Sequence, residues 1–308
     1  MIAAHYRHQV DLLLRVLPLV ASEAVFALKG GTAINMFERN MPRLSVDIDL
    51  TYLPLNDRVA AMQDIAQALE RIRMRIEKSG TGVQVRMLRQ TGAQETKIIC
   101  INERAQIKIE VNTIIRGHLF PVRMMDIAGE VEAEFGRFVS MPVVSRQELF
   151  GGKLCAALDR QHPRDLFDIY QLFAHEGLTK EIRAGFLAML LSHSRPIHEL
   201  LSPHRLDQSR VFQEQFSGMT IVPFRYADYE ETRERMIDEV SAGLINDEKR
   251  FLLSFAKGEP DWSLQELDRL QHMPAIQWKL RNIAILKERN PAKYALQFDE
   301  LEKVLMGD

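Results

Sequence analysis

The sequence predicts an α+β fold, with strands and helices mixed in the front half and helices alone in the back half. Several short segments before residue 145 alternate apolar and polar residues, which is the pattern of half-buried strands. After residue 145 the apolar residues recur every three or four positions, which is the pattern of amphipathic helices. We therefore expect an α+β core over residues 1–140 and a helical domain over residues 141–308.

Composition limits the class of protein. The chain has 308 residues and 46% hydrophobic content, enough for one large core or two modest ones. Its 40 basic and 42 acidic side chains exclude a globally basic coat for nucleic acid, but they leave room for a local basic groove. No apolar run approaches the roughly 20 residues that span a bilayer. Cys100 and Cys155 both lie in apolar runs, so we expect buried free thiols and a cytoplasmic protein.

The front half contains a regular succession of predicted elements. Apolar periodicity predicts helices over 3–20, 32–37 and 57–78, and an apolar run over 24–28 resembles a short strand. Residues 45–52 alternate strictly and predict a half-buried strand. Three further alternating segments, over 82–90, 95–102 and 105–115, predict an antiparallel meander.

The back half is predicted to be helical almost throughout. Apolar stripes at helical spacing, separated by prolines, predict seven helices. They cover residues 145–160, 164–175, 179–193, 208–216, 228–256, 263–271 and 275–287.

Asp47 and Asp49 are the first candidates for chemistry. Two residues apart on a strand, they leave the same face with Cα atoms roughly 6–7 Å apart. Two carboxylates that converge to about 4 Å repel by roughly 4 kcal/mol at an effective dielectric near 20. Solvation, a shared proton or a bound cation relieves that repulsion. An isolated D-x-D is most often a solvated strand face, so the pair alone does not define a site.

Glu110 strengthens the case for a metal site. In the segment QIKIEVN over 106–112, Ile107, Ile109 and Val111 alternate with polar residues. If this strand neighbours the D-x-D strand, Glu110 can reach the space of the two aspartates. Three carboxylates are suitable hard ligands for Mg²⁺, and a pair of ions suits phosphoryl displacement. An ordinary edge-strand acid is the alternative interpretation of Glu110.

The glycines before the D-x-D indicate where phosphates could bind. Gly30 and Gly31 follow the apolar run, and glycine lets the backbone approach a phosphate closely. Thr32 could cap the following helix or donate to a phosphate oxygen. Ser45, beside the D-x-D, could hydrogen-bond an acid or a phosphate. The G-x-x-x-x-G-K spacing of a Walker loop is absent.

Four motifs, in this order, resemble the AbiEii/AbiGii toxin family of nucleotidyltransferases, which includes the mycobacterial MenT toxins. The resemblance covers about residues 25–175. The motifs are LKGGTA over 28–33 with RLSVDIDL over 43–50, then IEV over 109–111, ELFGGKLCAALDR over 148–160 and RDLFDIY over 164–170. The resemblance implies a polymerase-β-like core, a mixed sheet with flanking helices, followed by a helical C-terminal region.

The resemblance also implies roles for single residues. Asp47 and Asp49 would hold Mg²⁺, and Glu110 would be the third acid or a base. Lys153 would contact the nucleoside triphosphate, and Asp165 would be the acid of the fourth motif. Lys153 lies in an apolar stretch, where an ammonium group is costly unless it snorkels to solvent or meets an anion.

The sequence alone also suggests roles for three residues that follow Lys153. Arg160 lies seven positions after Lys153 on roughly the same helix face, so it could add a second phosphate contact. Asp165 could instead orient Lys153 or Arg160. We expect Asp168 to be structural.

The function implied is transfer of a nucleoside monophosphate from an NTP to an acceptor hydroxyl, with two Mg²⁺ ions. The resemblance favours RNA as the acceptor, in particular the 3′ end of a tRNA. It also implies a toxin with a cognate antitoxin, or phage defence by abortive infection. Two alternatives stay open: nucleotidylation or phosphorylation of a protein side chain, and an inactive binding module.

Three basic clusters, over 71–75, 86–89 and 279–281, could form a groove for the acceptor. Each could equally be a solvated face of a helix or strand, and for any single cluster that interpretation is favoured.

Overall fold

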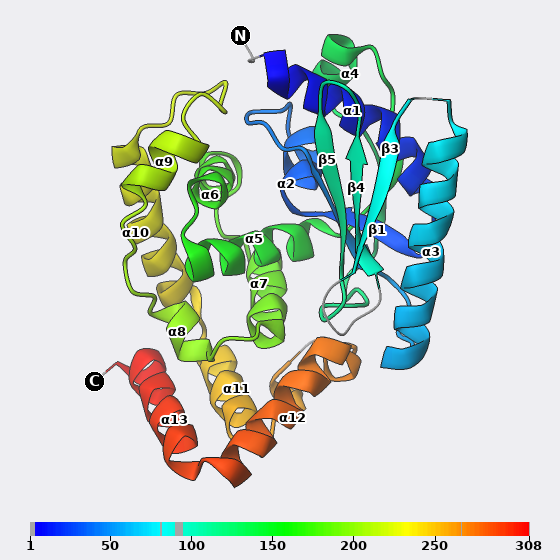
Figure 1. The fold of residues 1–308 in the computed structure, drawn as a ribbon. Coiled ribbons are helices and arrows are strands. Elements are labelled where there is room, and N and C mark those ends of the chain that lie inside the picture. Colours follow the sequence, from blue (N-terminus) through cyan, green and yellow to red (C-terminus); the bar gives the residue numbers. More distant parts are fainter. Residues whose placement is uncertain (1–3, 81, 90–94, 266, 308) are drawn as a thin grey trace. The chain divides into compact units, whose positions relative to one another are not determined.

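The computed structural model describes residues 4–80, 82–89, 95–265 and 267–307. The chain divides into two compact units (Figure 1). The first unit comprises Met1–Ser145 with Ser217–Pro223, and the second comprises Arg146–Phe216 with Phe224–Asp308.

The first unit is built on a seven-stranded sheet with the order β3-β4-β5-β2-β1-β7-β6. β2 pairs in parallel with β5, and β1 pairs in parallel with β7, while the other neighbours are antiparallel. The predicted mixed sheet and the antiparallel meander of β3, β4 and β5 are therefore confirmed. The strands are β1 (Phe26–Lys29), β2 (Asp47–Tyr52), β3 (Gln84–Arg89), β4 (Glu95–Ile101), β5 (Gln106–Asn112), β6 (Arg123–Asp126) and β7 (Ser140–Val143).

Helices α1 (Ala4–Ala21) and α3 (Arg58–Lys78) contact each other and the sheet (Figure 1). Along α3 the buried side chains recur at helical spacing, among them Ile65, Leu69 and Ile72. The Asp57 carboxylate caps this helix by accepting hydrogen bonds from the first backbone N–H groups. Both helices were predicted, because a long amphipathic stripe is a strong local signal.

Two short helical segments follow β1 directly, and the expected helix over 32–37 begins earlier than predicted. α2 covers Gly30–Ala33 and continues into a π-helical segment over Ile34–Glu38. The two glycines therefore form the first turn of the helix instead of preceding it.

The first unit extends beyond the expected boundary after residue 140, which falls inside β7. This strand pairs with β1 through Leu28 and Val143, so it belongs to the sheet. A distant segment also returns to the unit, since the backbone N–H of Leu44 donates to Met219 and that of Ile221 donates to Pro42. The sequence analysis missed β6, β7 and α4 (Gly129–Phe135), which are four to seven residues long and have weak periodicity.

The second unit is helical, as predicted. Among its described residues the helices are α5 (Arg146–Arg160), α6 (Pro163–His175), α7 (Lys180–Ser192), α8 (Ile197–Leu201), α9 (Ser209–Gln215), α10 (Tyr226–Gly243), α11 (Asn246–Ala256), α12 (Pro274–Arg289) and α13 (Pro291–Met306).

Two of the predicted helices are wrong, and a further helix was missed. The helix expected over 228–256 is divided into α10 and α11, and the Glu248 side chain accepts from the Ile245 backbone N–H at the new start. The helix expected over 263–271 is replaced by two 3₁₀ turns, Trp262–Leu264 and Leu270–His272. The sequence analysis missed α13. It interpreted the prolines as separators between helices, but Pro291 occupies the first turn of this helix.

Helices α5 and α7 approach each other through glycine. A Cβ atom on Gly185 would lie 2.0 Å from the carbonyl oxygen of Gln147, and one on Gly151 would lie 2.4 Å from the carbonyl carbon of Gly185. No side chain fits at either position, so this contact depends on two residues without a Cβ atom.

We therefore predict that Gly185→Ala lowers the free energy of unfolding by about 1–3 kcal/mol, because the methyl group forces the two helices apart. Urea-induced unfolding followed by circular dichroism measures this change. Gly243→Ala is the matched control, since a Cβ atom there meets only side-chain atoms, the nearest 3.6 Å away. Equal stabilities of the two variants would contradict this account of the α5–α7 contact.

Candidate active site

The polar face of β2 carries the two candidate aspartates. Ile48 and Leu50 are fully buried on one face of the strand. Asp47 and Asp49, which alternate with them, are half-buried on the other face. The predicted alternation is therefore confirmed over residues 47–50, although the strand begins at Asp47 and Thr51 is buried.

Glu110 lies on the same face of the sheet. β2 and β5 are parallel, with Asp49 opposite Glu110 and Asp47 opposite Lys108. Residues in register on adjacent strands point to the same side, so Glu110 is the direct neighbour of Asp49. The expectation that these two strands are neighbours is confirmed.

Two lysines bind the Glu110 carboxylate. The Nζ atom of Lys97 lies 2.8 Å from Oε1, and that of Lys108 lies 2.9 Å from Oε2. Burial alone would raise the pKa of Glu110, but the hydrogen bonds and charges of the two lysines outweigh it and hold the pKa below its ordinary value. The carboxyl is therefore ionised at neutral pH.

Lys29 adds a third basic group to this face. It is the register partner of Asp49 on the antiparallel strand β1. Burial lowers the pKa of Lys29, against the opposing attraction of Asp49 and Glu110. Four adjacent strands, β1, β2, β5 and β4, thus place Lys29, Asp49, Glu110 and Lys97 side by side in one row across the sheet. The sequence analysis assigned no role to the lysines, because their proximity follows from strand register and not from spacing.

The turn after β1 comes very close to Asp49. Gly30 has a φ of +73°, and a Cβ atom there would lie 2.6 Å from the Asp49 carboxylate. A Cβ atom on Gly31 would lie 2.7 Å from the Ser45 hydroxyl. Glycine is thus required twice, by backbone conformation at Gly30 and by close approach at both positions.

Thr32 joins this turn to β2. Its hydroxyl donates to the backbone carbonyl of Asp47 and lies 3.1 Å from the Ser45 hydroxyl. The expected capping role is wrong, since Lys29 occupies the N-cap position of α2 without a side-chain hydrogen bond. Thr32 is completely buried and positions the first residue of the D-x-D.

The acids fit a metal ion only in part. Within the part of the chain that the structure describes, no group of three or more His, Cys, Asp or Glu side chains is arranged to hold a metal ion. Both oxygens of Glu110 are in contact with lysines. Asp47 and Asp49 nevertheless offer the hard oxygen donors that Mg²⁺ prefers, and one or two carboxylates with substrate phosphates are its usual protein site.

A second cluster of charged residues lies in the helical unit. The Nζ atom of Lys153 lies 2.8 Å from Asp165 and 3.0 Å from Asp168. The Arg160 guanidinium binds both carboxylate oxygens of the same Asp165. Asp165 thus holds both basic residues, which was one of its expected roles. Asp168 also contacts Lys153, an interaction that the sequence analysis missed.

Burial and charge oppose each other at Asp165. Its side chain is 2% exposed, which would raise the pKa, but Lys153 and Arg160 outweigh this and hold the pKa far below the ordinary value. Asp165 is therefore a buried anion that depends on its two basic partners.

The α5–α6 turn brings Arg160 and Asp165 together. Gln161 adopts a positive φ of 47°, and the His162 ring caps α6 by accepting from the Arg164 backbone N–H. Both polar atoms of the Gln161 side-chain amide form hydrogen bonds. Its nitrogen donates to the His204 carbonyl, and its oxygen accepts from the Leu206 backbone N–H. No pattern in the sequence indicated Gln161.

The basic clusters proposed as an acceptor groove are mostly engaged within the protein. Arg71 and Arg75 both bind the buried Glu23, and Arg73 binds two glutamates of its own helix. Lys279 is 9% exposed and donates to backbone carbonyls just after α7. For the clusters over 71–75 and 279–281, the structure therefore favours a role in folding.

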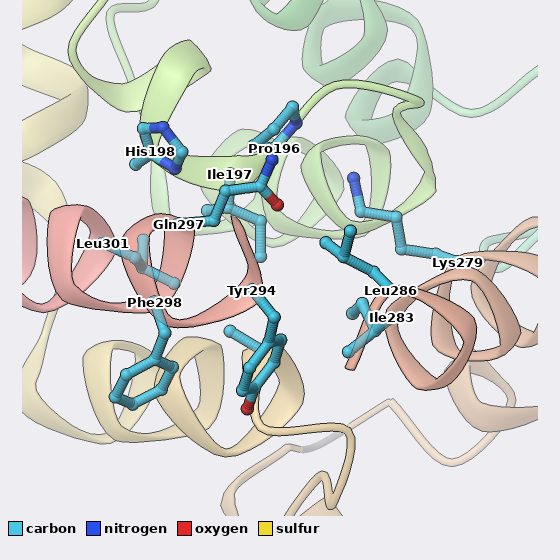
Figure 2. A pocket seen from close by; sticks show the side chains of 11 residues that line it. Pro196, Ile197, His198, Lys279, Ile283, Leu286, Tyr294, Gln297, Phe298 and Leu301 are labelled. Atoms are coloured by element: carbon cyan, nitrogen blue, oxygen red, sulfur yellow. The ribbon is translucent and has the colours of Figure 1, made fainter. Parts of the chain in front are cut away.

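The second unit also contains a largely apolar pocket, lined from α8, α11, α12 and α13 (Figure 2). None of the predicted metal-binding or nucleotide-binding residues lines it, whereas Lys279, from one of the three basic clusters, does. Its walls are Pro196, Ile197, His198, Ala256, Lys279, Ile283, Leu286, Tyr294, Gln297, Phe298 and Leu301.

Comparison with protein families identifies the chain. Residues 11–282 match the model of the nucleotidyl transferase AbiEii toxin family of type IV toxin–antitoxin systems. The chain belongs to this family. It is accordingly a nucleotidyltransferase toxin, as the four motifs indicated, and family membership implies an NTP substrate and a cognate antitoxin.

A solved structure has a similar fold. The chain resembles MenT4, a nucleotidyltransferase toxin of Mycobacterium tuberculosis H37Rv, with a TM-score of 0.60 and 16% sequence identity. The likeness covers 91% of this chain and 95% of MenT4. At this identity the similarity concerns the fold. No curated protein matches the AbiEii-family chain, and none of its described helices is long and apolar enough to cross a membrane.

We predict that Asp165→Asn lowers the free energy of unfolding at pH 7 by about 3 kcal/mol, because it leaves a buried ammonium with one fewer anion. The folded pKa of Asp165 is depressed, so its contribution is complete above the unfolded pKa of about 4 and is lost as the pH falls below it. Urea unfolding of both proteins between pH 3 and pH 7 measures the difference.

Glu214→Gln is the control for this measurement. It removes an exposed ion pair with Arg210, for which a loss of at most about 1 kcal/mol is expected. An Asp165→Asn difference that stayed constant down to pH 3 would show that the carboxylate charge does not stabilise the fold.

Proposed function

We propose that this AbiEii-family toxin transfers a nucleoside monophosphate from an NTP to a hydroxyl group of RNA, with the 3′ end of a tRNA as the preferred acceptor, in a Mg²⁺-dependent reaction. One observation carries the proposal. Asp49 and Glu110 are register neighbours on one face of the sheet, and the Gly30 turn lies against Asp49 so closely that it excludes any Cβ atom.

Asp47 and Asp49 would hold the Mg²⁺ ions, two of them in the full site, and Glu110 would be the third acid. Bound metal would supply charge neutralisation at the transferred phosphoryl group. The protein contributes the position of the donors, because Thr32 ties the Asp47 backbone to the glycine turn. Such fixed geometry lowers the cost of assembling the reacting groups.

The glycine turn would accept the triphosphate. Without side chains at Gly30 and Gly31, the backbone packs directly against the Asp49 carboxylate and the Ser45 hydroxyl, so the phosphates of a substrate held at Asp49 would lie next to this turn. The Ser45 hydroxyl could donate to a phosphate oxygen, and the Thr32 hydroxyl, 3.1 Å away, would contribute by holding the turn against β2 through its hydrogen bond to the Asp47 carbonyl.

We assign nucleotide binding to the charged cluster of the second unit as well. Lys153 and Arg160 would contribute positive charge to the bound triphosphate, and Asp165 holds both cations in place. A compact ammonium and a forked guanidinium are both suited to phosphate oxygens.

RNA is the proposed acceptor because the four motifs resemble those of the AbiEii/AbiGii toxins, and membership of the AbiEii family supports that resemblance. We propose that it acts in the cytoplasm, where NTPs, tRNA and a cognate antitoxin are available.

The proposal is tested with purified toxin, an α-labelled NTP, Mg²⁺ and total bacterial tRNA. We expect label at tRNA 3′ ends, detected by gel electrophoresis and by sequencing of the ends. Asp47→Ala and Lys153→Ala should each reduce labelling about 100-fold or more, because the first removes a proposed Mg²⁺ ligand and the second removes a positive charge proposed to bind the triphosphate. Chelation of the divalent ions should abolish labelling.

Asp126→Ala is the matched control, an exposed aspartate on β6 of the same sheet, and should label tRNA like the wild type. Near-wild-type labelling by Asp47→Ala or Lys153→Ala would show that the site is assigned wrongly. Label found in protein and not in RNA would replace the proposed acceptor by a protein side chain.

A further inference from the structure

The site contains its own counter-cations. Each oxygen of the Glu110 carboxylate is within 3 Å of a different lysine, Oε1 of Lys97 and Oε2 of Lys108. The backbone of the sheet places both lysines next to Glu110. Lys97 is the register partner of Glu110 on β4, and Lys108 precedes it by two residues on the same face of β5.

These ion pairs are partly shielded from water. The exposed fractions of the three side chains are 27% for Lys97, 35% for Lys108 and 30% for Glu110. Charges at this depth interact more strongly than charges in bulk water. The two lysines therefore offset the repulsion between Glu110 and its neighbour Asp49.

A divalent ion near Asp49 and Glu110 would meet both lysines. It would occupy the place that the two ammonium groups now hold at the Glu110 oxygens, and the positive charges would repel it. A triphosphate changes this balance, because its oxygens offer ligands to the metal and new anionic partners to the lysines.

We propose that Lys97 and Lys108 are positioning residues that act as an internal counter-cation of Glu110, which a metal ion must displace. The proposal rests on the metal-dependent function proposed above. In the absence of nucleotide the two lysines keep metal affinity low. Metal and NTP consequently bind together, and the lysines move from Glu110 to the phosphates when both arrive.

The test is a titration of the full-length protein with Mn²⁺ alone, followed by electron paramagnetic resonance of the free ion, so that no catalysis is needed. Lys97→Met and Lys108→Met keep much of the side-chain stem and remove the charge. Each should bind Mn²⁺ about tenfold more tightly than the wild type, which corresponds to about 1.4 kcal/mol. Lys97→Arg keeps the charge and should bind like the wild type.

Lys303→Met is the matched control. It removes the same charge from the chain and breaks a lysine–glutamate pair on α13, so its Mn²⁺ affinity should equal that of the wild type. Circular dichroism establishes that each variant is folded.

The outcomes separate the two proposals. Unchanged or weaker Mn²⁺ binding by folded Lys97→Met and Lys108→Met, with binding still abolished by Asp49→Asn, would overturn the role of the lysines and leave the metal site intact. Mn²⁺ binding that Asp49→Asn does not affect would overturn the metal site itself. A tenfold gain in both methionine variants, but not in Lys303→Met, would support the inference.

Discussion

The parallel pairing of β2 with β5 is the constraint on which the candidate site depends. It sets Asp49 opposite Glu110 and Asp47 opposite Lys108. A shift by one residue would place an isoleucine or a valine beside Asp49 and turn the acids of the two strands to opposite faces. The buried residues Ile48, Leu50 and Ile109 prevent that shift, since it would expose them. The hydrophobic face of the sheet thus fixes the geometry of the polar face.

The sequence predicted which residues share a face of each strand, but it did not predict which residues of neighbouring strands lie opposite each other. Alternation is a local property of one strand, so it indicated that Asp47, Asp49 and Glu110 each lie on the face that points away from the apolar core. Register is a tertiary property, so the approach of Lys97 to Glu110 had no counterpart in residue spacing. The same holds for the distant segment Ser217–Pro223, which joins the first unit through backbone hydrogen bonds that any residue type can form.

In the helical unit, the local signals were reliable for long helices and misleading at their ends. Pro291 stands in the first turn of α13, where a missing N–H has no cost, and the same residue type would end a helix elsewhere. The contact between Arg160 and Asp165 depends on a turn in which Gln161 adopts a left-handed backbone conformation. A glycine or asparagine at this position would have indicated such a turn in the sequence, but a glutamine does not. The contact of Asp168 with Lys153 was not predicted from residue spacing either, although only one helical turn separates Asp168 from Asp165.

Charge balance changes the argument for catalysis. Three acids on one sheet face suggested a metal ion, because unrelieved repulsion has to be offset. The structure offsets it with lysines, so repulsion alone no longer requires a cation. The glycine turn supplies the stronger reason. An ordinary salt-bridged strand face does not require glycine in the neighbouring turn, whereas here the backbone at Gly30 and Gly31 packs directly against the Asp49 carboxylate and the Ser45 hydroxyl. The two glycines therefore hold the backbone directly beside the acids, where the proposed triphosphate would have to bind.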